Sequence, residues 1–424
     1  MVLLRRAREL YLLLLVFAFL VLALVSLHQS MPAHRSEAMS MAAGFCGIFL
    51  AGHFVLTVLS PDADELLLPV TAMLCAIGLV FALRLNAGSA ALARKQLIWL
   101  GLGMVLMLAT VRVLRHYAVL RDYKYLAASA GVGLMAVTAL IGKEINGSKL
   151  WLGAGGFYFQ VTEAMKLLLV IFLAGYLADR RYMLAGVSRR WRAFRVPTLP
   201  YLLPLLVIWG FTMALMAWQH DLGAMLLLMS VTLLMLYAAT GRWAFVAAGL
   251  VIVVLNLLAA YHLFHYVHAR IDVWLHPLTR VKEGYQIAQS IFAFAGGGVL
   301  GTGIGRGFPT YIPVVQTDFI FAAIGEELGT AGAMAIVGVY VVLAFRGLRI
   351  SIRQPADYGM LLAIGVTAIL SVQAIVIMAG DLALIPITGI TLPFVSYGGS
   401  SIVVNFILVG ILLRLSTSRP RPTV

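Results

Sequence analysis

One acidic residue stands where a long polar segment meets an apolar run. The string Gln316-Thr317-Asp318 ends the segment 264–318 and is followed by an apolar run over 319–345. A carboxylate at this position has two open roles. It could cap the free backbone N–H groups at the start of a helix, as Thr317 also could. It could instead act as a general base at the mouth of a cavity, taking a proton from a nucleophile.

Further polar residues occur in the apolar part of the chain near this point. Glu326 and Glu327 lie inside the run that Asp318 precedes. A carboxylate within a membrane span is costly unless it is paired, and is a functional candidate by default. Ser396 begins a string rich in glycine and serine (396–401), which would also allow close helix approach.

Two groups of polar residues earlier in the chain also lie within or between apolar runs. Glu163 and Lys166 are three residues apart, so on a helix they share a face and could form an ion pair. Gln219 and Asp221 lie in a short turn between two apolar runs. Asp221 could be a plain helix cap there.

The composition predicts that membrane-spanning helices position all these residues. Of the 424 residues 62% are apolar and only 11% are charged, and the mean hydropathy is +0.99. These values exclude a soluble enzyme and a disordered chain, so we expect an all-α polytopic membrane protein. The apolar runs long enough to span a membrane are 10–28, 41–60, 66–83, 97–113, 125–142, 164–178, 200–218, 222–240, 243–263, 319–345, 359–380 and 398–414.

The net charge of +14 is a signal of topology. Basic residues concentrate in 112–124, 180–195, 346–353 and 419–421, which all become cytoplasmic when the N-terminus is inside. Both termini are then cytoplasmic. The remaining positive charge suits anionic lipid, and we expect no nucleic-acid partner.

The segment 264–318 lies outside in this topology. Its middle, 285–298, is apolar enough to form a re-entrant or interfacial helix. Cations in the outer segments could be incidental, since long loops translocate regardless of charge, or they could serve an anionic substrate. These cations are Lys143, Lys149, Arg270, Arg280, Lys282 and Arg306.

The ordered series of polar strings resembles the SEDS family (shape, elongation, division and sporulation), which includes the RodA, FtsW and SpoVE types. The strings run in the family order through the chain from about residue 66 to 415. They comprise Asn146-Gly147 with Trp151 and Gln160, Glu163 with Lys166, Gln219 with Asp221-Leu222-Gly223, Gly284-Tyr285-Gln286 with Gln289-Ser290, Gly301 with Gly303 and Gly305, Thr317-Asp318-Phe319-Ile320-Phe321, Gly325-Glu326-Glu327-Leu328-Gly329, and Leu392-Pro393 with Ser396-Tyr397-Gly398-Gly399-Ser400-Ser401.

The resemblance implies a ten-helix core over 63–418, with the long extracellular loop 264–318 between its seventh and eighth spans. Residues 1–62 would be an additional N-terminal pair of transmembrane helices, and 419–424 a cytoplasmic tail. The extra pair favours a RodA-like role in elongation over a role in division.

The resemblance further implies a peptidoglycan glycosyltransferase of the bacterial cytoplasmic membrane. Such enzymes polymerise lipid II into β-1,4 glycan at the outer face, together with a class B penicillin-binding transpeptidase. The family's catalytic aspartate corresponds to Asp318, which favours the general base over the cap.

The other residues expected in the substrate cavity follow from the polar strings and from the predicted topology. Positive charge or a divalent cation, Mg²⁺ or Mn²⁺, would offset the charge of the departing pyrophosphate. Val314 stands where the family often has an acidic residue, so the metal ligands stay unknown. The expected cavity residues are Glu163, Lys166, Gln219, Asp221, Lys149, Arg280, Lys282, Arg306, Glu326 and Ser396.

Two other classes of function stay open at this point. A lipid II flippase or other transporter would also use carboxylates within spans, such as Glu326, and glycine-broken helices. A non-catalytic scaffold for cell-wall enzymes would need neither a base nor a substrate cavity.

Overall fold

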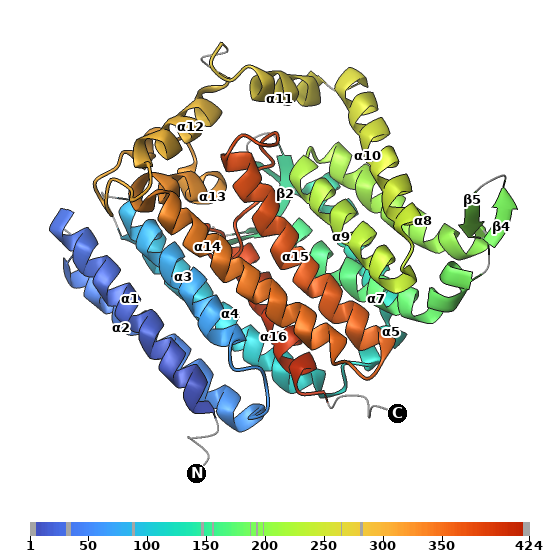
Figure 1. Cartoon of the computed structure of the whole chain (residues 1–424), viewed down its shortest axis with the longest axis horizontal. Helices are drawn as coiled ribbons and strands as arrows, with labels where there is room; N and C mark the ends of the chain where they lie inside the picture. Colours follow the sequence, from blue (N-terminus) through green and yellow to red (C-terminus); the bar gives the residue numbers. More distant parts are fainter. Residues whose placement is uncertain are drawn as a thin grey trace. The chain divides into compact units, whose positions relative to one another are not determined.

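The computed structural model of the chain is helical almost throughout (Figure 1). It describes residues 6–30, 35–86, 90–145, 148–154, 157–186, 188–191, 194–197, 199–263, 265–279 and 283–418. The chain divides into two compact units. Unit 1 comprises Met1–Val113, Tyr261–Arg346 and Gln373–Thr417, and unit 2 comprises Leu114–Ala260, Gly347–Val372 and Ser418–Val424.

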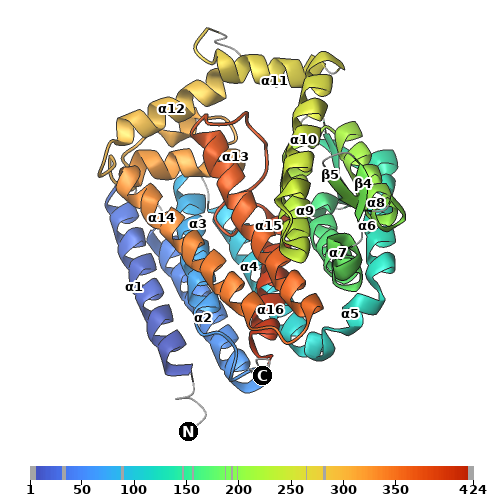
Figure 2. The ribbon, with the colours of Figure 1, turned by 45° about the vertical axis from the view of Figure 1, so that its right-hand side comes forward.

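Unit 1 is built around two helices, α3 and α16, whose residues are buried along nearly their whole length. Helices that are apolar on all sides are expected at such positions. The N-terminal pair, α1 and α2, runs side by side in both views (Figure 1, Figure 2). The elements that lie wholly in this unit are α1 (Ala7–Ser30), α2 (Arg35–Leu59), α3 (Leu67–Arg84), α4 (Ala91–Val113), α11 (His265–Leu275), α12 (Tyr285–Gly297), η4 (Pro309–Tyr311), α13 (Val315–Asp318) and α16 (Gly399–Ser416).

Unit 2 holds further helices and two small antiparallel sheets. α14 (Ile320–Ile352) and α15 (Asp357–Asp381) each contribute residues to both units, and α10 (Trp243–Leu263) ends three residues past the boundary. The other elements are η3 (Leu114–His116), α5 (Val119–Asp122), α6 (Lys124–Ile141), β1 (Lys143–Ile145), β2 (Ser148–Ala154), β3 (Phe157–Gln160), α7 (Val161–Gly186), β4 (Ser188–Trp191), β5 (Phe194–Pro197), α8 (Leu199–Trp218) and α9 (Leu222–Thr240).

Each of the twelve apolar runs predicted from the sequence coincides with a helix. In the part of the chain that the structure describes, ten helices are long and apolar enough to cross a membrane. The two other runs correspond to α8 and α10, which contain the shorter apolar segments Leu202–Trp218 and Trp243–Leu255. The expected polytopic all-α architecture is therefore confirmed.

The two sheets were not predicted. β1, β2 and β3 form one sheet, and β4 pairs with β5 in a second. The chain between β1 and β2 is Asn146-Gly147, the strongest dipeptide signal for a two-residue hairpin turn. Short strands between long apolar runs are easily missed because their alternation extends over only a few residues.

The segment 264–318 is partly helical where the structure describes it, as expected. Its predicted helix over 285–298 is α12, and Figure 2 shows α11, α12 and α13 together at one end of unit 1. The segment 297–308, called here the glycine loop, docks onto a break in α14. Hydrogen bonds of 3.0 Å join it to the break: Thr302 N to Glu326 O, Gly303 N to Glu327 O, Thr330 N to Gly298 O and Ala331 N to Val299 O.

The break in α14 is at Gly329, whose φ of 69° and ψ of −175° are not helical. Only glycine adopts this conformation without strain. A Cβ atom at residue 329 would also lie 2.3 Å from the backbone nitrogen of Gly301. The predicted run 319–345 is thus two helical pieces, and the backbone groups freed at the break bond to the glycine loop.

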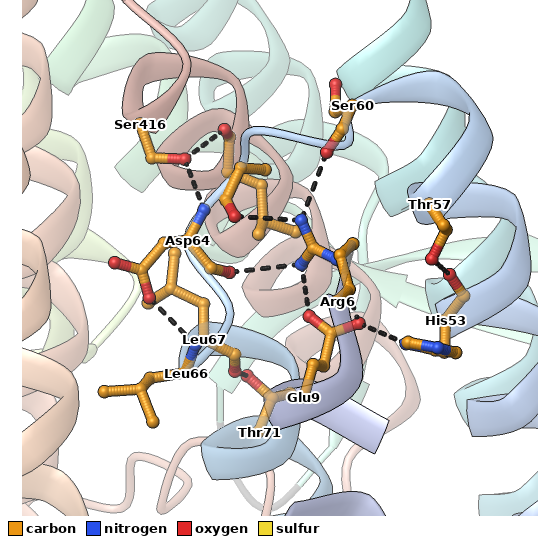
Figure 3. A network of polar contacts seen from close by, with 12 residues as sticks. Arg6, Glu9, His53, Thr57, Ser60, Asp64, Leu66, Leu67, Thr71 and Ser416 are labelled. Carbon is orange, nitrogen blue, oxygen red and sulfur yellow. Dashed lines mark hydrogen bonds and ion pairs between the residues drawn. The ribbon is translucent and has the colours of Figure 1, made fainter. Parts of the chain in front are cut away.

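A buried polar network ties the N-terminal pair to the rest of unit 1 (Figure 3). Arg6 pairs with Glu9, and Glu9 Oε1 lies 2.6 Å from Nδ1 of His53 on α2. All three side chains are almost fully buried. The guanidinium of Arg6 also donates to main-chain carbonyls of the segment before α3, namely those of Ser60, Ala63 and Asp64.

Asp64 extends this network to the end of α14 and to α16. Its carboxylate pairs with Arg346, and its backbone N–H donates to Ser416 Oγ at 2.9 Å. The N-terminal pair therefore belongs to the same compact unit as α3 and α16. The domain boundary at 62/63 stays a prediction, and the predicted tail 419–424 lies outside the described residues.

We expect Glu9→Gln to destabilise unit 1 by about 1.5–3 kcal/mol, because Arg6 and His53 lose their buried anionic partner. Thermal unfolding in detergent measures this as a lower melting temperature. Glu37→Gln is the matched control, since the pair that Glu37 on α2 forms with Arg94 is partly exposed and 3.5 Å long. Equal melting temperatures for the two variants would contradict the assigned importance of the network.

Candidate functional site

Asp318 ends α13, a single turn of unit 1 just before α14, and its side chain is partly buried. The turn follows Val314, whose φ of 58° is in the left-handed region. Its carbonyl accepts hydrogen bonds from Thr317 N, Asp318 N and Thr317 Oγ1. A β-branched residue in this region is strained, and such strain tends to cluster at functional sites.

The backbone before Asp318 is held by the segment that precedes α16. Ser396 Oγ donates to the carbonyl of Thr317 at 2.6 Å, and Tyr397 N donates to the carbonyl of Gln316 at 2.9 Å. Ser396 also accepts from Leu392 N at 2.9 Å. The structure therefore brings Ser396 to the candidate base, where it acts on main-chain groups.

The helix start after Asp318 is capped by a different residue. Asp381, the last residue of α15, accepts a hydrogen bond from Phe321 N at 3.1 Å through Oδ2. The capping role considered for Asp318 is thus filled from another helix. Sequence reasoning missed Asp381 because it lies just after the predicted run 359–380. A carboxylate directly continuing an apolar run is a signal that could have marked Asp381 as a candidate, although not as the cap of α14.

Two opposing influences act on the Asp318 carboxyl. Burial raises its pKa above the ordinary value, which suits a group that must accept a proton. A hydrogen bond with Thr317 and the positive charge of Arg270 on α11 oppose this rise in the pKa. Among the described residues, Arg270 is therefore a cation whose charge reaches the candidate base.

Arg270→Ala should raise the pKa of Asp318 further, because it removes a cation that favours the ionised carboxylate. A general base works in its ionised form, so the acid limb of the rate–pH profile should move to higher pH. Initial polymerisation rates measured across the acid range test this. Arg306→Ala is the control and should leave the midpoint pH of this acid limb unchanged. A midpoint unchanged by Arg270→Ala would show that its charge does not reach the carboxylate.

The two carboxylates inside α14, Glu326 and Glu327, accept hydrogen bonds from backbone N–H groups of the glycine loop. Glu327 is fully buried and pairs with Arg84 of α3 at 2.7 Å between Nε and Oε1. Its Oε2 also accepts from Gly305 N. Glu326 is partly exposed and accepts from Phe308 N at 2.7 Å. Arg306, in the same loop, is exposed.

In unit 2 the predicted ion pair between Glu163 and Lys166 is confirmed. Lys166 Nζ lies 2.6 Å from Glu163 Oε2, and both side chains are buried near the start of α7. Gln219 is also buried, and its Nε2 donates to the carbonyl of Met135 at 3.0 Å. Their place in a substrate cavity stays a prediction.

Asp221 caps α9, because its Oδ1 accepts from Ala224 N at 3.0 Å. The helix-cap alternative is thus confirmed for this residue, and a further part in the cavity stays a prediction. Lys149 is exposed on β2. Arg280 and Lys282 lie outside the described residues.

No metal centre is formed by protein side chains within the described residues. They contain no group of three or more His, Cys, Asp or Glu suited to a metal ion. The described side chains therefore do not by themselves supply three such ligands for a divalent cation.

A family model for the FtsW, RodA and SpoVE proteins, described as cell cycle proteins, matches residues 64–421. The chain belongs to this family. The resemblance seen in the ordered polar strings is confirmed. With the ten apolar helices, membership makes the chain a multi-pass membrane protein.

Similar proteins carry names from all three branches of the family. Peptidoglycan glycosyltransferase RodA of Mycobacterium bovis is 37% identical, and the match covers 99% of this chain and 92% of the relative. Stage V sporulation protein E of Bacillus subtilis is 32% identical over 85% of this chain and 99% of the relative. Probable peptidoglycan glycosyltransferase FtsW of Trichlorobacter lovleyi is 33% identical, and the match covers 84% of this chain and 93% of the relative.

Solved structures share the fold. A chain from a peptidoglycan synthase complex that coordinates polymerization and crosslinking matches with a TM-score of 0.70 and 27% identity, covering 84% of this chain and 97% of that chain. RodA of Thermus thermophilus matches with a TM-score of 0.62 and 24% identity, and the match covers 85% of this chain and 98% of that chain. The mycobacterial match extends over nearly the whole chain, so the N-terminal pair has a counterpart there.

Proposed function

We propose that this chain is a peptidoglycan glycosyltransferase that polymerises lipid II into β-1,4 glycan strands, for cell elongation or division. The observation that carries the proposal is its 37% identity, over 99% of its length, to a RodA named for this activity. The relatives from the other two branches support the same class of enzyme.

In this proposal Asp318 is the general base. The 4-hydroxyl oxygen of the acceptor GlcNAc bonds to the anomeric carbon of the donor MurNAc. The proton of that hydroxyl passes to the carboxylate of Asp318. The bond between that carbon and the lipid pyrophosphate breaks, and the pyrophosphate leaves with the bonding electrons. One direct displacement inverts the α-linked donor into a β-linked product. What supports this role is the anchored backbone on either side of Asp318, at Thr317 and Phe321, and the partial burial of Asp318.

Departure of the pyrophosphate creates negative charge that the protein must offset. Arg306 is an exposed cation of the outer segment in unit 1 and is our first candidate. Lys149, Arg280 and Lys282 stay predicted contributors. A divalent cation, Mg²⁺ or Mn²⁺, also stays a proposal, and loss of activity on chelation followed by recovery on adding back the ion tests it.

We place the chain in the bacterial cytoplasmic membrane with both termini inside. The basic segments of the sequence support this orientation. We further propose a class B penicillin-binding transpeptidase as partner, because the similar solved chain belongs to a complex of polymerization and crosslinking. Lipid II and membrane lipid are the other expected partners.

Purified protein supplied with labelled lipid II, with and without the cognate transpeptidase, tests the proposed activity. Glycan ladders on product gels are the expected result. Absence of ladders under both conditions, together with movement of lipid II between leaflets, would favour the flippase. Absence of both activities would favour the non-catalytic scaffold.

A further inference from the structure

The C-terminal end of α15 is the point where three other segments of unit 1 are tied together. The carboxylate of Asp381 binds Phe321 N at the start of α14. Its main-chain carbonyl accepts from Ser290 Oγ of α12 at 2.5 Å. Two residues later, the carbonyl of Ala383 accepts from Trp274 Nε1 of α11 at 2.8 Å. Asp381 is only 2% exposed, so water competes little for the two bonds that this residue forms.

A carboxylate suits this position for two physical reasons. The first N–H groups of a helix have no partner within the helix and need an outside acceptor. The N-terminal end also carries partial positive charge, which favours an anion. A cap supplied by the residue just before α14 would satisfy only the free N–H groups of that helix. A cap supplied by α15 also fixes where α14 begins.

The position fixed in this way is that of Asp318. Phe321 lies three residues after Asp318, and the intervening chain is the short link between α13 and α14. On the other side, Ser396 and Tyr397 hold the carbonyls of Thr317 and Gln316. The candidate base therefore lies between two anchors, one formed by the segment before α16 and one by Asp381.

We propose that Asp381 is a positioning residue for glycan polymerisation, which acts by holding the start of α14 and hence the carboxylate of Asp318. This inference rests on the proposed function. Asp381 need not touch substrate, and the part that matters is a hydrogen-bond acceptor in the right place. A displacement of about 1 Å at a reacting group can cost as much as 100-fold in rate.

The test compares variants that keep or remove this acceptor, in the full-length protein with its transpeptidase and labelled lipid II. Asp381→Ala should lower kcat by about 10–100-fold and change KM by less than about twofold, because lipid II still binds. Asp381→Asn keeps an acceptor oxygen of the same reach and should restore kcat to within about threefold of the original protein. Asp357→Ala, at the opposite end of α15, is the matched control and should keep full activity, since Asp357 pairs with Arg181 at a partly exposed site.

If Asp381→Ala does not yield folded protein, Asp381→Ser replaces it, because the shorter side chain leaves room for water but withdraws the direct bond to Phe321. Full kcat in the alanine or serine variant would overturn the proposal. Asparagine failing to restore kcat would overturn it as well, since charge and not the acceptor would then be needed. Asp318→Asn in the same assay separates the two questions: if that variant is active, the base assignment fails, whatever Asp381 does.

Discussion

Asp318→Asn should lower the rate of glycan polymerisation by about 10²–10⁴-fold, the contribution typical of a general base. Asparagine has the same size but cannot take the proton of the acceptor hydroxyl. The fold should be unaffected, because the start of α14 is capped by Asp381 and the preceding carbonyls are held by Ser396 and Tyr397. We therefore expect lipid II binding to persist while turnover is lost.

Initial rates from product gels measure this effect. Asp357→Asn serves as a control for removing an acidic side chain elsewhere in the protein, and it should polymerise normally. A near-normal rate for Asp318→Asn, in purified protein with its transpeptidase, would show that another group takes the proton.

Arg84→Leu should destabilise unit 1 by about 3–5 kcal/mol, because it leaves Glu327 buried without its cationic partner. Arg84 also donates to the carbonyl of Gly307 at 2.7 Å, so the glycine loop loses a second support. The melting temperature in detergent should fall clearly. Polymerisation should fall with it, since the loop leads directly to η4 and α13.

The double variant Arg84→Leu/Glu327→Leu separates charge from packing. Removing both charges eliminates the uncompensated carboxylate, so part of the lost stability should return. Arg94→Leu is the control, because Arg94 is largely exposed and its pair with Glu37 is 3.5 Å long. A double variant less stable than Arg84→Leu alone would contradict the assigned role of the pair.

Local patterns in the sequence predicted the helices and some of their polar contacts. The twelve apolar runs, the pair between Glu163 and Lys166, and the cap at Asp221 each depend on residues a few positions apart. Such spacings have a direct structural meaning on a helix. The fold class followed from the apolar runs and the family from the resemblance of the ordered polar strings, and both are confirmed.

The contacts that organise the candidate site join residues far apart in the chain. Arg84 meets Glu327, Asp381 meets Phe321, and Ser396 meets Thr317. No periodicity in one sequence pairs such residues, so the partner of Glu327 and the cap of α14 could not be foreseen. The break at Gly329 was hidden for a similar reason, because a long apolar run looks the same whether its helix is continuous or interrupted.

Four of the hydrogen bonds between the glycine loop and α14 join main-chain atoms, and this close backbone approach determines which mutations can damage the contact. A methyl group at Gly301 would lie 2.3 Å from the carbonyl oxygen of Glu327, and one at Gly297 would lie 2.1 Å from that of Gly325. Even alanine, the mildest of replacements, is therefore excluded by volume. A saturation screen for bacterial growth should find these sites intolerant of every amino acid, irrespective of polarity, whereas Val299 and Leu300 between them, which are 69% and 83% exposed, should accept many.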